Sequence, residues 1–141
     1  MQIKSIMTQQ VVTLTRDNTV RDAINIMKEK DIGSVIVVDE DFMVIDILTE
    51  GDILKLIDKD FKINAALRIS ELPKKEHLFS ILETESIENA IKILYEVPIH
   101  HLVVTDYSGI LKGIISTKDI IKAEKRLQKT FPYFPNSQLI H

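Results

Sequence analysis

The sequence predicts an α/β (α+β) fold made of two tandem β-α-β-β-α repeats that pack about a pseudo-twofold axis. When the chain is shifted by 67 residues, residues 11–55 lie over residues 78–122 without a gap. In that frame 11 of the 45 paired positions are identical, and a further 11 are apolar in both copies. The hydrophobic periodicity also changes in the same order in both copies. Self-similarity of this length indicates one supersecondary unit that occurs twice.

Each repeat opens with a short extended run, at Val11–Leu14 and Leu78–Ile81. Apolar residues then recur at helical spacing, at Val20, Ala23, Ile24 and Met27 and, in the second copy, at Ile87, Ala90, Ile91 and Leu94. Two β-rich runs joined by a turn follow, at Ser34–Val38 and Met43–Leu48 and at Leu102–Thr105 and Ile110–Ile115. A second helix closes each unit, near Glu50–Ile57 and Thr117–Lys129.

We therefore expect repeat 1 over residues 1–58, a linker over 59–75, repeat 2 over 76–129 and a C-terminal tail over 130–141. A single unit of about 50 residues would leave one face of its sheet uncovered and would be marginally stable alone. Two copies can cover each other, so the whole chain is expected to form one module.

The composition excludes several classes of protein. The chain has no cysteine, so disulfides and thiolate metal sites are excluded, and a reducing cytoplasm is the expected location. The formal charge of −3 argues against direct binding of nucleic acid. No apolar run approaches the ~18 residues that a membrane span needs, and the N-terminus lacks the apolar stretch of a signal peptide.

Several motifs together resemble the CBS (cystathionine-β-synthase) domain family. They are Ser5–Thr8 with Val11–Thr13, the strands Ile36–Asp39 and Leu102–Asp106, and the segment Gly113–Asp119, which is similar to the family's Gly-h-h-Ser/Thr-x-x-Asp signature, where h is apolar. The likeness covers residues 3 to about 125. It implies a regulatory module without catalytic activity, which binds AMP, ADP, ATP or S-adenosylmethionine in a cleft between paired repeats.

The signature also has a chemical interpretation of its own. Gly113 lacks a side chain and lets a ligand approach the backbone. Ser116 and Thr117 stand where a helix begins, and a helix N-terminus attracts phosphate. The Asp119 carboxylate can accept hydrogen bonds from two ribose hydroxyls. The structural alternative is a capping box, in which Ser116 and Asp119 only start the helix.

The resemblance implies that the backbone at Leu78, Phe79 and Ser80 and the side chain of Ile99 hold the base, and that His100 or His101 reaches a phosphate. The alternative for the histidines is that one packs and the other is solvated. Adjacent strand residues point to opposite faces, so a metal site at the pair is not expected. No Ser/His/Asp arrangement predicts catalysis.

The first repeat offers a poorer counterpart of this site. Its residues are Val12, Thr13, Ser34, Thr49 and Asp52. Asp46 stands where the second copy has Gly113, and its carboxylate should crowd or repel a phosphate. We expect one dominant nucleotide site, in the second repeat.

Assembly and partners follow from the remaining apolar residues. We expect a homodimer formed through the second helices, at Ile53, Leu54, Leu56, Ile57, Ile120 and Ile121. The aromatic tail Phe131–Pro135 packs on its own chain or covers a neighbouring subunit. A regulated protein partner would fit the nucleotide-sensing function. The rival hypothesis is a structural dimerisation or protein-interaction module whose ligand sites are vestigial.

Overall fold

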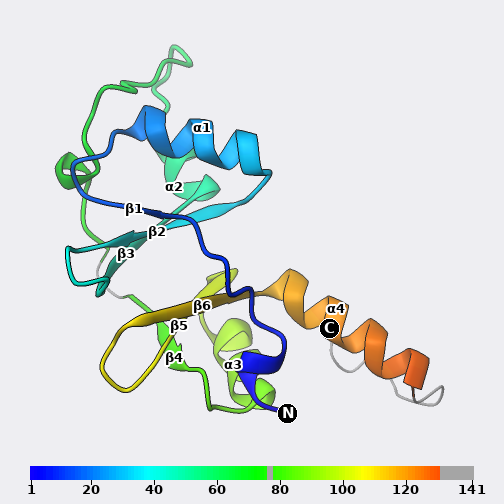
Figure 1. Ribbon diagram of the computed structural model, residues 1–141. Coiled ribbons are helices and arrows are strands. Elements are labelled where there is room, and N and C mark those ends of the chain that lie inside the picture. The colour runs from blue at the N-terminus through cyan, green and yellow to red at the C-terminus, as the bar shows by residue number, and fades with distance from the viewer. Residues whose placement is uncertain (76–77, 131–141) are drawn as a thin grey trace. The chain divides into compact units, whose positions relative to one another are not determined.

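The computed structural model describes residues 1–75 and 78–130, and the aromatic tail lies outside the described residues (Figure 1). The predicted order β-α-β-β-α is confirmed in both repeats. The first contains β1 (Thr13–Leu14), α1 (Val20–Lys30), β2 (Ser34–Val38), β3 (Val44–Thr49) and α2 (Glu50–Lys55). The second contains β4 (Ser80–Leu82), α3 (Ile87–Glu96), β5 (His101–Thr105), β6 (Leu111–Ser116) and α4 (Thr117–Thr130). Short 3₁₀ helices at Ile3–Ser5 and Ile69–Glu71 precede the repeats.

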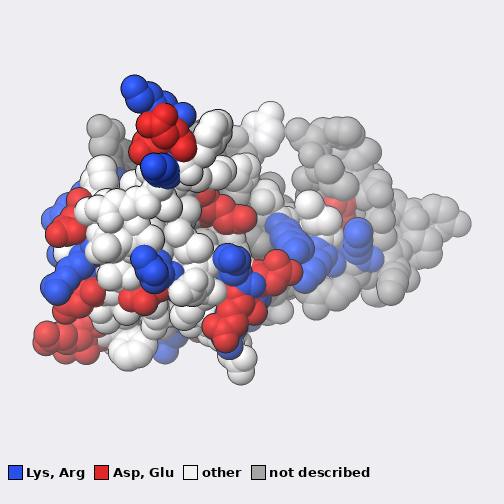
Figure 2. Space-filling view, turned by 90° about the horizontal axis from the view of Figure 1, so that it is seen from above, with Lys and Arg blue, Asp and Glu red and all other residues white. Residues whose placement is uncertain are grey.

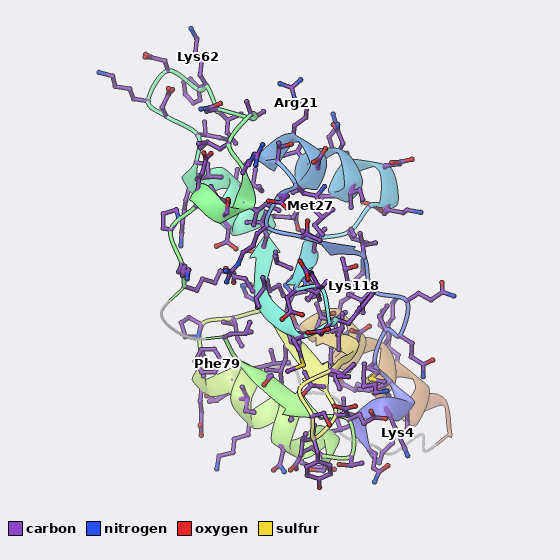
Figure 3. All side chains as sticks on the ribbon, turned by 60° about the vertical axis from the view of Figure 1, so that its left-hand side comes forward. Lys4, Arg21, Met27, Lys62, Phe79 and Lys118 are labelled. Carbon is purple, nitrogen blue, oxygen red and sulfur yellow. The ribbon has the colours of Figure 1, made fainter. Side chains whose placement is uncertain are left out.

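The sheet of the first repeat has the order β1-β2-β3. β1 runs parallel to β2, with Thr13 opposite Ile36, and β2 runs antiparallel to β3, with Ser34 opposite Thr49. Figure 1 shows α1 and α2 on one face of this sheet. Met27 of α1 is buried toward the sheet, whereas Arg21 points away from it (Figure 3). This amphipathic helix is the one that its apolar spacing predicts.

The sheet of the second repeat has the order β4-β5-β6, and β4 runs parallel to β5, with Ser80 opposite Val103. Its core is built from side chains at most 9% exposed that come from all three strands and both helices. They include Ile81, Ala90, Leu102, Val104, Ile115 and Ile120. The parallel pair needs a crossover connection, which α3 supplies.

The described chain divides into two compact units that do not coincide with the sequence repeats. The first-repeat unit contains Val11–Leu78 and Gly109–Leu111. The second-repeat unit contains Met1–Gln10, Phe79–Ser108 and the described residues from Lys112 on. Each unit therefore includes the short helix that precedes the other repeat.

Main-chain hydrogen bonds fix these exchanged segments. In the second-repeat unit Ile3 is completely buried, and its N–H donates to the Glu85 carbonyl at 2.9 Å. In the first-repeat unit the Ile69 N–H donates to the Asn18 carbonyl at 2.8 Å. The linker is therefore part of the first-repeat unit and lies beside the residues predicted to form the first site.

The charged side chains are mixed in sign on the face that Figure 2 shows. Lysine and arginine alternate there with aspartate and glutamate. A nucleic-acid-binding surface instead gathers basic residues on one face. Among the described residues, no helix combines the length and the apolar character needed to cross a lipid bilayer.

Candidate functional site

Ser116 and Asp119 meet at the junction of β6 and α4. The Asp119 Oδ2 accepts a hydrogen bond from the Ser116 N–H at 2.8 Å and another from its Oγ at 3.1 Å. In return the Ser116 Oγ accepts from the Asp119 N–H at 3.2 Å. Both residues are half-buried. In the described part of the chain no hydrogen bond reaches the Asp119 Oδ1, so this carboxylate keeps an acceptor for another group.

The histidine pair lies next to this helix start. The Thr117 N–H donates to the His100 carbonyl at 3.2 Å, which ties the entry of β5 to the first turn of α4. His100 is exposed and His101 is half-buried. The same link occurs in the first repeat, where the Glu50 N–H donates to the Gly33 carbonyl at 3.0 Å. The fold therefore brings the residue before β5 to the helix N-terminus.

Phe79, Ser80 and Ile99 belong to the same unit as Ser116 and Asp119. Phe79 and Ile99 are partly buried and pack against one hydrophobic core cluster, and Ser80 is exposed. Figure 3 labels Phe79 on the segment that leads into β4 and Lys118 in the first turn of α4. Leu78 is 36% exposed and belongs to the first-repeat unit, whereas Phe79 and Ser80 belong to the second-repeat unit. The three backbone positions predicted to bind the base are therefore divided between the two units.

Gly113 has a packing role that the sequence did not reveal. A Cβ atom there would lie 2.7 Å from the Thr8 carbonyl oxygen and 2.8 Å from the Met7 Sδ. Thr8 and Ile114 form an antiparallel bridge, with N–H to carbonyl distances of 2.9 and 3.0 Å. The exchanged N-terminal segment thus fills the space beside the glycine. Packing alone accounts for this residue, and its contact with a ligand stays a prediction.

The first repeat repeats the same local geometry at Thr49 and Asp52. Asp52 Oδ2 accepts from the Thr49 N–H at 2.8 Å, and the Thr49 Oγ1 accepts from the Asp52 N–H at 3.3 Å. Ser34 lies opposite Thr49 across the β2–β3 pair. Val12 and Thr13 lie further along the sheet, where the Val12 carbonyl accepts from the Ile36 N–H at 3.1 Å.

One contact distinguishes the two copies, and it involves Lys75. The Lys75 Nζ lies 2.7 Å from the Asp52 Oδ2 and also donates to the Ile47 carbonyl. Burial by itself raises the pKa of Asp52, but the hydrogen bond from Lys75 and the Thr49 N–H outweigh it and lower the pKa below its usual value. The Asp52 carboxylate is therefore held ionised and paired.

Lys75 borders a pocket of about 280 Å³ in the first-repeat unit. Most of its lining is apolar, and the charged groups come from β3, α2 and the linker. The lining includes Val37, Asp46, Leu48, Asp52, Leu56, Ile69, Leu72, Lys74 and Lys75. The Asp46 carboxylate accepts a hydrogen bond from the Ile47 N–H at 2.7 Å. The prediction that the Asp46 carboxylate repels a phosphate at this site did not take into account Lys74 and Lys75 of the linker, which line the same pocket.

The sequence contained a signal for Lys75 that the repeat comparison did not use. Extending the 67-residue shift upstream places Lys75 over Thr8 and Ile47 over Ile114. Thr8 bonds Ile114 through its backbone, and Lys75 bonds Ile47 through its side chain. Lys75 and Thr8 thus occupy equivalent positions before the two repeats, but only Lys75 brings a charged side chain to the β-strand that it contacts.

Comparisons with known proteins agree with this architecture. The family model for the CBS domain matches residues 3–59 and 69–126. An inosine-5'-monophosphate dehydrogenase of Aquifex aeolicus is 34% identical over 114 residues, which are 81% of this chain and 22% of that enzyme. Another, from Methanocaldococcus jannaschii, is 29% identical over 117 residues, 83% of this chain and 22% of that enzyme. The chain thus corresponds to a minor part of either dehydrogenase.

Two solved structures share the fold over nearly their whole length. A CBS domain protein from Pyrobaculum aerophilum complexed with AMP superposes with a TM-score of 0.79 at 18% identity, covering 92% of this chain and 97% of that one. The CBS domain pair of protein MJ0100, complexed with 5'-methylthioadenosine and S-adenosyl-L-methionine, gives 0.72 at 24% identity and covers the same shares, 92% and 97%. The repeated element order, the signature junctions and the two family matches establish that the chain belongs to the CBS domain family.

Proposed function

We propose that this chain is a regulatory module that binds an adenosine-containing nucleotide, mainly at the Ser116–Asp119 junction, and that it is not an enzyme. The observation that carries the proposal is the half-buried Asp119 carboxylate, whose Oδ2 is fixed by Ser116 while its Oδ1 accepts no hydrogen bond in the described chain. A fixed carboxylate suits a ribose diol, because its free lone pairs accept both hydroxyl groups without reorganisation.

The surroundings of Asp119 support the same ligand. α4 is 14 residues long, so its N-terminus carries the partial positive charge that attracts phosphate. The His100 carbonyl is bonded to the first turn of this helix, which brings the histidine pair close to a phosphate placed there. CBS domain proteins with this fold have been crystallised with AMP and with S-adenosyl-L-methionine, which are both adenosine compounds.

The second candidate function is a structural or protein-interaction module with vestigial ligand sites. A specific observation favours it: Thr19 and Asp22 form the same capping box at the start of α1, outside both signature segments. The box by itself is therefore no evidence for a ligand. Gly113 is likewise no evidence for a ligand, because packing against Thr8 and Met7 already explains the absence of a side chain there.

A panel of adenosine compounds separates the two candidates. We expect AMP, ADP, ATP or S-adenosylmethionine to raise the melting temperature, because a ligand at 100 times its dissociation constant stabilises a protein by about 2.7 kcal/mol. Calorimetric titration should then give one ligand per chain. If no compound shifts the melting temperature and none releases heat, the vestigial module is the correct interpretation.

We also infer a cytoplasmic homodimer that contacts a regulated protein. Three of the apolar side chains predicted for the dimer support it: Leu54 of α2 is 67% exposed, Ile57 just after α2 is 37% exposed and Ile121 of α4 is 38% exposed. The prediction for Ile120 is wrong, because this side chain is buried in the core of its own unit. Exposed apolar side chains that gather into one patch mark surfaces that pair with another protein. We expect light scattering to give twice the mass of the chain, and replacement of Leu54 by lysine to reduce it. A monomer at high micromolar concentration would contradict the proposed dimer.

A further inference from the structure

The pocket of the first-repeat unit that Asp52 lines has room for a small ligand but contains a charged group of the chain itself. Its volume of about 280 Å³ is close to the lower end of the range for small-molecule sites, about 300–1,000 Å³. Apolar side chains of Ile69 and Leu72 line it, and the Asp52 carboxylate supplies an acceptor. Space and an acceptor are therefore both present, as a nucleoside site would require.

One oxygen of this carboxylate is already bound to a charged group of the chain, and in the described chain no hydrogen bond reaches its Oδ1. The Lys75 ammonium binds the Asp52 Oδ2 at 2.7 Å, and a second hydrogen bond to the Ile47 carbonyl anchors it over the end of β3. The two side chains are only 32% and 23% exposed, so the pair is partly shielded from water. The Lys75–Asp52 pair joins two opposite charges, whereas a ribose hydroxyl brings only a neutral donor to the same carboxylate. A diol that needs both carboxylate oxygens would have to displace Lys75 from Oδ2.

The second-repeat unit has no such occupant among its described residues. Thr8 stands at the position equivalent to Lys75 and is hydrogen-bonded to Ile114 through its backbone. The hydrogen bonds that reach the Asp119 carboxylate there all come from Ser116. The two carboxylates thus share the same capping geometry and differ in whether an ammonium covers them.

We propose that Lys75 is a built-in occupant of the first-repeat pocket, which keeps a nucleoside off Asp52 and limits the module to one nucleotide per chain. This inference rests on the proposed function and adds to it the residue that makes the two copies unequal. A ligand enters the first pocket only when the Lys75–Asp52 pair opens. The linker that carries Lys75 therefore controls the stoichiometry of binding.

Removing the ammonium should open the first pocket. The experiment uses the full chain with Asp119→Ala, which weakens the second site, and titrates it with adenosine, a neutral ligand that offers no phosphate to Lys75. Adding Lys75→Met should make adenosine bind at least about 10-fold more tightly, because the charged competitor of the hydroxyls is gone. Adding Asp52→Asn to that variant should abolish the gain, since the diol then loses its carboxylate.

Three further variants keep the test sharp. Lys75→Arg retains the positive charge and should leave the pocket closed, and Lys75→Gln is a second neutral variant for the case in which methionine impairs folding. Lys62→Met is the matched control, because Lys62 lies on an exposed loop of the same unit and points away from it (Figure 3). It should give no gain in adenosine binding.

The outcomes separate this inference from the proposed function. If the wild-type chain binds one AMP but neither neutral variant gains adenosine binding, Lys75 is not the occupant and only this inference fails. Two AMP molecules per wild-type chain would also overturn it while the proposed function stands. If the wild-type chain and all variants bind no adenosine compound, the proposed function fails and this inference fails with it.

Discussion

Replacement of Asp119 by alanine is expected to weaken nucleotide binding by about 10- to 150-fold. This range corresponds to a loss of about 1.5–3 kcal/mol, the usual contribution of hydrogen bonds to a charged group. The half-buried carboxylate is proposed to accept both ribose hydroxyls, and no other described side chain at the α4 start supplies that acceptor. Isothermal titration calorimetry with AMP, ATP and S-adenosylmethionine measures the loss directly.

Asp52→Ala is the matched control for this measurement. Both aspartates occupy the third position of a capping box, so each replacement should weaken a helix start by roughly 1 kcal/mol. Only Asp119→Ala should also lower the affinity, because Lys75 already engages Asp52. Equal affinity losses in the two variants would contradict a single dominant site, and unchanged affinity in both would exclude the carboxylates from binding.

The sequence was sufficient for the order of elements because each element is encoded locally. The spacing of Val20, Ala23 and Met27 predicts α1, and all three side chains are buried in the fold. Because the two copies align, the same spacing predicts a helix in the second copy, in which Ala90 is also fully buried. Helix boundaries were less exact, since α2 ends at Lys55, two residues before the predicted Ile57.

Long-range contacts could not be predicted in this way. The burial of Ile3 beneath the second repeat depends on residues more than 70 positions away, which no local periodicity encodes. The Lys75–Asp52 pair could not be predicted from local sequence either. Lys75 belongs to a Pro-Lys-Lys segment of the linker, and this composition is typical of a solvated turn. The alignment of Lys75 with Thr8 shows that the copies differ at this position, but only the fold shows that Lys75 reaches the Asp52 carboxylate.

The turn after β2 shows a second limit of sequence reasoning. Phe42 takes a positive φ of 61° at the position where the second copy has Gly109, with φ of 85°. A bulky residue rarely adopts this conformation. The Asp39 Oδ1 accepts hydrogen bonds from the Asp41 and Met43 N–H groups and holds the loop closed. Here the architecture of the repeat overrides the preference of a single residue.

Gly113→Ala is expected to lower the free energy of unfolding by about 1–3 kcal/mol, the usual cost of overpacking. The new Cβ would lie 2.7 Å from the Thr8 carbonyl oxygen, and this oxygen cannot retreat freely because it accepts the Ile114 N–H. The Met7 side chain can move aside more easily, but the Thr8–Ile114 bridge must lengthen. Urea denaturation followed by circular dichroism measures the change.

Gly51→Ala provides the control within the same chain. The nearest atom to a Cβ there is the Thr49 Oγ1 at 3.7 Å, which is ordinary contact, and Gly51 lies within α2. Alanine should therefore leave stability unchanged or raise it by up to about 1 kcal/mol, because glycine is the poorer helix residue. If Gly113 serves only to let a ligand approach, the result would differ: Gly113→Ala would reduce AMP affinity while its unfolding free energy stayed at the wild-type value.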